Sequence, residues 1–244
     1  MSAGKAYIGT SGWNYKHWGG PFYPADLPQK KWLEYYSESF NTVEINNSFY
    51  RLPEETTFEK WRDTVSENFI FAVKASRYIT HMKKLKEPVK SLENFMKNLQ
   101  GLREKTGPIL FQLPGTWPLN LERLQSFLTA LPSGYRYTFE FRHASWFSDD
   151  IYQALSRHKV ALCFYNLRGK NTPMPITADF IYVRMHGPGE KAYQGHYGAE
   201  TLLSLAKDIT AWTKERMDVY CYFNNDEKGY AVRDAMQLRE LITG

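Results

Sequence analysis

Short hydrophobic stretches alternate with amphipathic stretches along most of the chain. Eight of the short stretches are rich in β-branched and aromatic residues and are bounded by turn residues, a pattern typical of buried strands. These predicted strands span Ala6–Thr10, Thr42–Asn47, Phe69–Ala75, Ile109–Leu113, Arg136–Phe141, Val160–Tyr165, Phe180–Met185 and Asp218–Asn224. Between most of them apolar residues recur at helical spacing, as in 88–105, where we expect the helix to stop at Gly107-Pro108.

The alternation of strands and helices predicts the fold class. Strand–helix units in sequence favour a parallel sheet, and eight of them favour a closed barrel over an open sheet. The 244 residues also match the roughly 250 of such barrels. We therefore predict an α/β protein with a single TIM-type (β/α)8 barrel, in one domain over residues 1–244. The sixth unit is irregular, because Gly169–Ala178 lacks a helical pattern, so a loop is expected to replace that helix or the barrel to be distorted there.

Loop lengths predict which rim of this barrel carries the chemistry. Joins from a helix to the next strand are short. Joins from a strand to the next helix are long and rich in aromatic and charged residues, as in Ser11–Gln29, Ser76–Glu87 and His186–Gly198. Barrel enzymes carry their active sites on these strand-to-helix loops. A functional site is therefore expected at the carboxyl ends of the strands.

Polar residues occupy one face of the predicted strands near those ends. Successive side chains of a strand alternate faces, so residues of one parity meet inside a barrel. Charges buried there are costly unless they are paired. The inward set would form either a substrate pocket or a network of salt bridges that fills the barrel. Its members are Glu44, Asn46, Lys74, Gln112, Glu140, Arg142, Arg184, His186 and Asn224.

The residue types in this set suggest roles. Glu44, Glu140 and His186 are the candidate catalytic residues, because carboxyl and imidazole groups transfer protons. Lys74, Arg142 and Arg184 would hold an anion, and the amides Asn46, Gln112 and Asn224 would hydrogen-bond the substrate. Trp13 and Tyr50, from the rim loops, either cap the barrel and pack against neighbouring loops or stack on a sugar or base. Gly187-Pro188-Gly189, after the seventh strand, is either only a turn or a segment whose backbone N–H groups hold a phosphate.

Three functions remain open on these observations. The first is an enzyme of hydrolase, lyase or isomerase type that acts on a polar, anionic small molecule, phosphorylated or sugar-like. The second is a protein that binds nucleic acid or cleaves a phosphodiester, favoured by the net charge of +5 and the basic loop Arg77–Lys86. The third is a non-catalytic barrel scaffold.

Cofactors and location are less constrained. No nucleotide-cofactor motif is present, so the cofactor stays unknown. Glu44, Glu140, His186 and Asp226, with His81 and His143 in nearby loops, could ligate a metal, but their spacing is not diagnostic and neighbouring cations would oppose it. We therefore assign no metal ligands.

The expected location is the cytoplasm. No apolar run approaches the roughly 18 residues that span a membrane, and the first five residues lack the apolar stretch of a signal peptide. Cys163 and Cys221 lie in predicted strands, where buried thiols are expected. The sequence does not predict an oligomeric state.

Several motifs resemble one protein family. They are Gly9-Thr10-Ser11-Gly12-Trp13, Glu44-Ile45-Asn46-Asn47-Ser48-Phe49-Tyr50, Phe111-Gln112-Leu113-Pro114, Glu140-Phe141-Arg142-His143-Ala144-Ser145-Trp146, Tyr182-Val183-Arg184-Met185-His186-Gly187 and Phe223-Asn224-Asn225. In this order they resemble the YecE-like proteins, domain-of-unknown-function family number seventy-two. The resemblance implies a barrel of the same β/α type and no settled activity. Its motifs fall on the strand ends already selected by parity.

Overall fold

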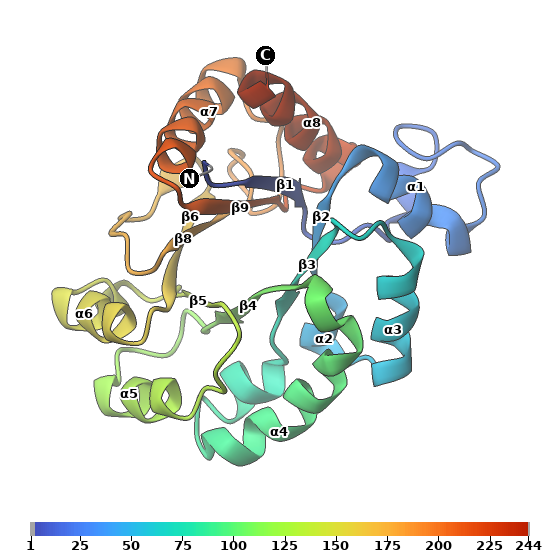
Figure 1. Ribbon diagram of the computed structural model, residues 1–244. Helices are drawn as coiled ribbons and strands as arrows, with labels where there is room; N and C mark the ends of the chain where they lie inside the picture. Colours follow the sequence, from blue (N-terminus) through green and yellow to red (C-terminus); the bar gives the residue numbers. More distant parts are fainter. Residues whose placement is uncertain (1–2, 244) are drawn as a thin grey trace. The chain divides into compact units, whose positions relative to one another are not determined.

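The computed structural model describes residues 3–243, and its main feature is a parallel sheet whose strands alternate with helices (Figure 1). The strand order is β1-β9-β8-β6-β5-β4-β3-β2, and a short β7 pairs with β6. This topology is that of a (β/α)8 barrel of the TIM type, which confirms the predicted fold class. The strands are β1 (Ala6–Thr10), β2 (Thr42–Ile45), β3 (Ile70–Lys74), β4 (Thr106–Gln112), β5 (Tyr137–Glu140), β6 (Ala161–Leu167), β7 (Lys170–Asn171), β8 (Phe180–Met185) and β9 (Asp218–Phe223).

Helices follow the strands along the chain. The α-helices are α1 (Trp32–Ser39), α2 (Asn47–Tyr50), α3 (Glu55–Thr64), α4 (Pro88–Leu99), α5 (Leu121–Thr129), α6 (Asp149–Arg157), α7 (Ala199–Lys214) and α8 (Tyr230–Thr243). Shorter helical turns are η1 (Lys16–Trp18), η2 (Gln29–Lys31), η3 (Tyr78–Met82), η4 (Gln100–Lys105), η5 (Ala144–Trp146) and η6 (Glu227–Gly229). No helix within residues 3–243 is long and apolar enough to cross a membrane; the cytoplasmic location stays a prediction.

The chain divides into two compact units. Unit 1 comprises Met1–Glu44, Phe164–Thr172 and Phe180–Gly244, and unit 2 comprises Ile45–Cys163 and Pro173–Asp179. The chain passes from one unit to the other within β2, within β6, and again at both ends of 173–179. The single domain over residues 1–244 stays a prediction.

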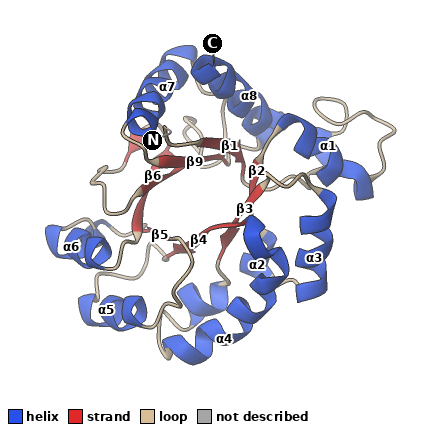
Figure 2. Ribbon diagram, viewed as in Figure 1, coloured by secondary structure: helices blue, strands red, loops and turns tan. Residues whose placement is uncertain are grey.

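In unit 1, β1 and β8 both pair with β9 in parallel register, with Ala6 opposite Val219 and Phe180 opposite Asp218. Helices α7 and α8 lie side by side next to these strands (Figure 2). Leu202 and Ile209 of α7 and Leu238 of α8 are buried, as the helical spacing of their apolar residues requires. All six residues of β8 are buried, so this strand is covered on both faces.

In unit 2, β3, β4, β5 and the start of β6 pair in parallel order. The helical segment predicted for 88–105 is found as α4, which ends at Leu99, followed by η4, which ends at Lys105. Gly107-Pro108, expected to separate this helix from the next strand, instead lies inside β4. A Cβ on Gly107 would lie 2.5 Å from Cγ2 of Ile70, so the close approach of β3 requires glycine. Pro108 lacks an N–H and lies where the β3–β4 register shifts. The close approach of β3 to β4, and not the end of a helix, explains why glycine and proline occupy positions 107 and 108.

The irregularity expected in the sixth unit is confirmed. Residues 172–179, all of them described, contain no helix, and β6 instead turns back through β7 in an antiparallel pair. Thr177 Oγ accepts the Leu162 N–H at 2.8 Å and donates to the Val160 carbonyl at 2.7 Å. A threonine side chain therefore pairs backbone groups at the start of β6. The predicted buried thiols, Cys163 and Cys221, are both buried and free.

Candidate active site

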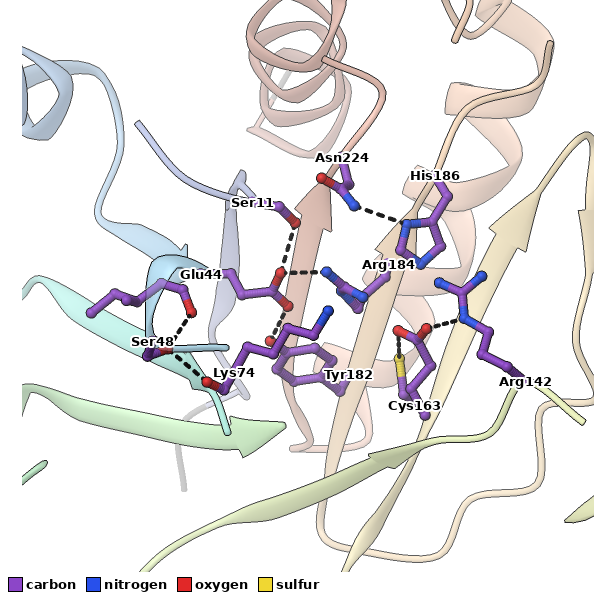
Figure 3. A network of polar contacts seen from close by, with 12 residues as sticks. Ser11, Glu44, Ser48, Lys74, Arg142, Cys163, Tyr182, Arg184, His186 and Asn224 are labelled. Carbon is purple, nitrogen blue, oxygen red and sulfur yellow. Dashed lines mark hydrogen bonds and ion pairs between the residues drawn. The ribbon is translucent and has the colours of Figure 1, made fainter. Parts of the chain in front are cut away.

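The carboxylate of Glu44 is the centre of a polar cluster in unit 1 (Figure 3). Its Oε1 accepts hydrogen bonds from Ser11 Oγ and Arg184 Nη2, each at 2.7 Å, and its Oε2 accepts one from Tyr182 OH at 2.6 Å. Ser11 directly follows β1, and Glu44 is the third residue of β2. Tyr182 and Arg184 stand two residues apart on β8, so they share the face that parity assigned to them.

This cluster contains a buried ion pair between Glu44 and Arg184. Glu44 is 0% exposed and Arg184 is 1% exposed. Burial acts to raise the pKa of Glu44, but the Arg184 charge and the hydrogen bonds from Tyr182, Arg184 and Ser11 outweigh it, so the pKa lies below its ordinary value. Burial, with the nearby Glu44 charge, raises the pKa of Tyr182 well above 10. Glu44 is therefore an ionised acceptor at neutral pH, and Tyr182 a protonated donor.

His186 lies in unit 1, one residue beyond the end of β8, and is 0% exposed. Its Nδ1 is 3.2 Å from Asn224 Nδ2 (Figure 3). An amide nitrogen can only donate, so Nδ1 accepts and the ring proton is on Nε2. The rings of Tyr165 and Tyr193 approach the imidazole edge to face, at 5.8 and 5.5 Å between centroids. The residue is thus held in one tautomer between two aromatic rings.

The Gly187-Pro188-Gly189 turn does not fit the phosphate site expected from the sequence. The N–H of Gly187 donates to Tyr197 OH at 2.8 Å, and the N–H of Gly189 donates to the Gln194 carbonyl at 3.1 Å. Pro188 has no N–H. Gly187 also has a φ of +101°, and a Cβ there would lie 2.4 Å from the Gln194 carbonyl oxygen. The prediction of phosphate binding by this turn is wrong, because its amides close the loop instead.

Asp226, in the loop after β9 of unit 1, is a second carboxylate with polar partners. Trp18 Nε1 donates to its Oδ1 at 2.5 Å, and His17 Nε2 lies 3.1 Å from its Oδ2. Burial raises the pKa of Asp226 to about 6, and the Trp18 hydrogen bond and the His17 charge offset only part of the rise. This group titrates near neutral pH, where proton transfer is most efficient.

Asp226→Asn is expected to remove a pH dependence of stability. The native pKa of about 6 exceeds the ordinary 3.8, so the native state holds its proton more tightly than the unfolded state. The wild type therefore loses stability as the pH rises from about 4 to 6, by about 1–2 kcal/mol after allowing for solvent screening. Asn keeps the acceptor for Trp18 and does not ionise. Urea unfolding at pH 4 to 8 should show that the free energy of unfolding declines less with rising pH for the variant than for the wild type. The same decline in both proteins would contradict the raised pKa of Asp226.

In unit 2 the carboxylate of Glu140 is also paired. Glu140 is the last residue of β5 and is 0% exposed. Its Oε1 accepts a hydrogen bond from Arg142 Nε, and Cys163 Sγ lies 3.9 Å from its Oε2 (Figure 3). Gln112 ends β4 directly opposite Glu140 in the sheet register and donates to the Leu113 carbonyl at 3.1 Å. Glu140 therefore has a cation on one oxygen and a thiol near the other.

The other unit 2 candidates lie around α2. Lys74 Nζ lies 4.1 Å from the ring centroid of Phe49, a cation–π contact. The backbone carbonyl of Lys74 accepts a hydrogen bond from Ser48 Oγ at 2.6 Å (Figure 3). Asn46 precedes α2, and its Oδ1 is buried without a hydrogen-bond partner in the described chain. Tyr50 is 75% exposed and lines a cleft of about 410 Å³ with Arg51 and other residues of 47–57. Trp13, in unit 1, is only 9% exposed.

The structure thus joins the predicted site residues into smaller groups: Glu44 with Arg184, His186 with Asn224, and Glu140 with Arg142. That all nine inward residues line one pocket stays a prediction, as do the roles of Trp13 and Tyr50. Ser11 and Tyr182 were not among the candidates. Both stand in the quoted motifs, and Tyr182 has the same strand parity as Arg184. A hydroxyl at inward parity was the signal that could have found them.

The basic loop and the metal candidates have local partners. Lys83 pairs with Glu87, and His81 Nδ1 is 2.9 Å from Thr80 Oγ. Burial, then the charges of Lys74 and Arg77, lowers the pKa of His81. His143 Nδ1 accepts the Ser145 N–H at 3.2 Å. Within residues 3–243, no three His, Cys, Asp or Glu side chains gather as ligands for a metal ion.

Sequence comparisons connect the chain to known proteins. It matches the family described as "Protein of unknown function DUF72" over residues 7–244. The UPF0759 protein YunF of Bacillus subtilis is 27% identical over 272 residues, 97% of this chain and 94% of that protein. The UPF0759 protein YecE of Escherichia coli K12 is 30% identical over 143 residues, 58% of this chain. The chain spans about half the length of the Escherichia coli relatives it matches (50%).

Solved structures are similar over nearly the whole chain. A DUF72 family protein of Thermotoga maritima is 29% identical with a TM-score of 0.87, covering 98% of this chain and 100% of that one. A DUF72 family protein of Enterococcus faecalis has a TM-score of 0.83 at 18% identity, covering 98% and 96% of the two chains, which shows the fold alone. With the motifs and topology described above, these matches establish that the chain belongs to the DUF72 family of proteins of unknown function.

Proposed function

We propose that the protein is an enzyme that performs acid–base chemistry on a small polar molecule carrying an anionic or strongly polar oxygen. The observation that carries the proposal is the His186–Asn224 contact of 3.2 Å in unit 1. An amide donor on Nδ1 favours the neutral imidazole with its proton on Nε2. Such a histidine is suited to donating a hydrogen bond to an oxygen that becomes negative during a reaction.

The Glu44 cluster supports the same proposal through its location and rigidity. Ser11, Glu44, Arg184 and His186 come from the carboxyl ends of β1, β2 and β8, and Asn224 from that of β9. Barrel enzymes draw catalytic residues from the ends of several strands. Three hydrogen bonds on Glu44 hold Arg184 in one orientation, and a preorganised guanidinium is well suited to a carboxylate or phosphate group. In this proposal Arg184 orients the substrate, and Glu44 fixes and neutralises Arg184.

Ligand binding tests the proposal. We expect inorganic phosphate, sugar phosphates or small sugar acids to raise the melting temperature. At 100 times its dissociation constant a ligand adds about 2.7 kcal/mol, or about 5–10 °C for a chain of this size. His186→Asn should weaken binding at least tenfold, because asparagine reaches only the Nδ1 position. His186→Gln should retain more affinity, because its amide reaches the Nε2 position. Arg233→Met, on an exposed position of α8, is the matched control and should bind as the wild type does.

Other outcomes would favour the alternative functions. Retention of single- or double-stranded oligonucleotides that weakens steeply with salt would support a nucleic-acid protein, as the positive charge suggested. If no tested anion or metabolite shifts the melting temperature and the His186 variants change stability alone, the enzyme proposal fails in favour of a barrel scaffold.

A further inference from the structure

A buried carboxylate, Asp234, ties together three segments of unit 1 outside the groups described above. It lies on α8 and is 0% exposed. Its Oδ2 accepts from Asn225 Nδ2 at 2.6 Å and from the Tyr197 N–H at 3.1 Å, and its Oδ1 receives Nδ1 of His196. Asn225 Nδ2 also donates to the Gly195 carbonyl at 2.8 Å, so two acceptors fix the orientation of this amide. Both donors to Oδ2 are therefore unambiguous.

His196 has the opposite arrangement to His186. A carboxylate can only accept, so Nδ1 of His196 carries a proton, and in the neutral ring Nε2 keeps the lone pair. The His196 side chain is 49% exposed, and its ring stacks on Tyr230 at 5.8 Å between centroids. In the described chain Nε2 makes no hydrogen bond. A buried carboxylate on one ring nitrogen and a half-exposed ring with a lone pair on the other is the arrangement of a general base.

The two histidines are also attached to one loop. His186 begins the loop after β8, and His196 lies near its end. Tyr197 OH accepts a hydrogen bond from the Gly187 N–H at 2.8 Å and donates one to Asn166 Oδ1 at 3.0 Å. Gly187 follows His186 and Tyr197 follows His196, so the hydrogen bond between Gly187 and Tyr197 joins the residues next to the two histidines. Asp234 therefore holds the far end of the segment that begins at His186.

We propose that His196 is the proton-accepting residue of this protein and that Asp234 is its positioning residue. The inference rests on the proposed function and supplies its base. A proton leaving an O–H or an acidic C–H of the substrate goes to Nε2 of His196, and the electron pair it leaves goes to the substrate oxygen. The resulting imidazolium is compensated by Asp234. The substrate class is therefore a small molecule with such a proton next to a carbonyl-type oxygen.

The tautomers of the two histidines give a direct test. Long-range proton–nitrogen NMR spectra, assigned with His196→Gln and His186→Gln, should show the Nδ1–H form for His196 and the Nε2–H form for His186. Asp234→Asn should reverse His196. The amide oxygen must occupy the Oδ2 position, which receives two donors, so the NH2 group faces Nδ1 and donates to it. In the same way Asn224→Asp should reverse His186 to the Nδ1–H form.

Chemical reactivity separates a basic nitrogen from a structural one. Diethyl pyrocarbonate acylates an imidazole nitrogen that has a free lone pair, so Asp234→Asn should slow modification of His196 at least tenfold. His158, which is exposed in unit 2, is the internal control and should react at an unchanged rate. An Nε2–H form of His196 in the wild type, or unchanged reactivity in Asp234→Asn, would overturn the proposal. These spectra need no substrate, so their failure is distinct from a failure of the ligand-binding test.

Discussion

Arg184→Met is expected to lower the free energy of unfolding by about 3–5 kcal/mol, because removing one partner of a buried ion pair strands the other charge. Glu44 is 0% exposed and would keep only the hydrogen bonds from Ser11 and Tyr182. Urea unfolding at pH 7 measures the loss. The control Arg233→Met, at an exposed position, should stay within about 0.5 kcal/mol of the wild type.

A double variant tests whether the stranded charge is the cause. Glu44→Gln with Arg184→Met removes both charges. The amide oxygen of Gln can accept from one of the two hydroxyls, Ser11 or Tyr182, and its NH2 group can donate to the other, so most of the lost stability should return. Equal instability of the single and double variants would show that lost packing, not charge, dominates. The double variant also provides a folded protein without the Arg184 guanidinium for the ligand-binding test.

The pH dependence should differ between the wild type and Arg184→Met. In the wild type the pKa of Glu44 lies below its ordinary 4.5. The stability contributed by this carboxylate is therefore present above that value and is lost as the pH falls through the lower native pKa. Without Arg184, burial dominates and raises the native pKa, which reverses the sign. The deficit of Arg184→Met should accordingly shrink as the pH falls, above 4.5 because the variant gains stability as Glu44 takes up its proton, and below 4.5 because the wild type loses stability.

Trp146→Ala is the second change with a large expected effect, a loss of about 3–5 kcal/mol. Trp146 follows the Glu140–Arg142 pair in unit 2 and is 0% exposed. Its ring stacks on Phe141 at 4.9 Å, with 1° between the planes, and meets Trp117 edge to face at 5.3 Å. Its Nε1 donates to the Trp117 carbonyl at 2.8 Å. The substitution removes both ring contacts and leaves a cavity.

Trp146→Phe separates the contribution of ring packing from that of the hydrogen bond to the Trp117 carbonyl. Phenylalanine keeps the stack on Phe141 but leaves the Trp117 carbonyl without its donor, which costs about 1–2 kcal/mol. Urea unfolding should rank the proteins as wild type, Trp146→Phe, then Trp146→Ala. Leu203→Ala, at a residue of α7 that is 45% exposed, is the control for loss of apolar surface and should cost well under either. A loss below about 1 kcal/mol for Trp146→Ala would mean that this aromatic group is not a packing centre.

The strands could be predicted because runs of β-branched and aromatic residues favour buried strands wherever they lie in the fold. Β-branched and aromatic runs such as Ala6–Thr10 and Phe180–Met185 match β1 and β8 to the residue. Strand parity also predicted that Tyr182 and Arg184 share one face of β8, since side chains alternate whatever the neighbouring strand is. The position of Gly107 inside β4 could not be predicted, because the residue that requires glycine there, Ile70, belongs to another strand.

The candidate site also combines features that the sequence predicts with features that only the folded structure decides. Glu44, Arg184 and His186 were identified from the sequence because a charge at inward parity is a local signal. Which group each of them meets is not local: Glu44 and Arg184 are 140 residues apart, and the pairing of Glu44 with Ser11 and Tyr182 exists only once β1, β2 and β8 are folded.

The clearest division is between residue type and chemical state. The sequence by itself determined the strand–helix alternation, the polar strand ends and the family, because these depend on residue order and spacing. Only the tertiary structure decided that an amide faces Nδ1 of His186 while a carboxylate faces Nδ1 of His196. Both are histidines in the same loop, and the partner that folding brings to Nδ1 decides which ring nitrogen carries the proton.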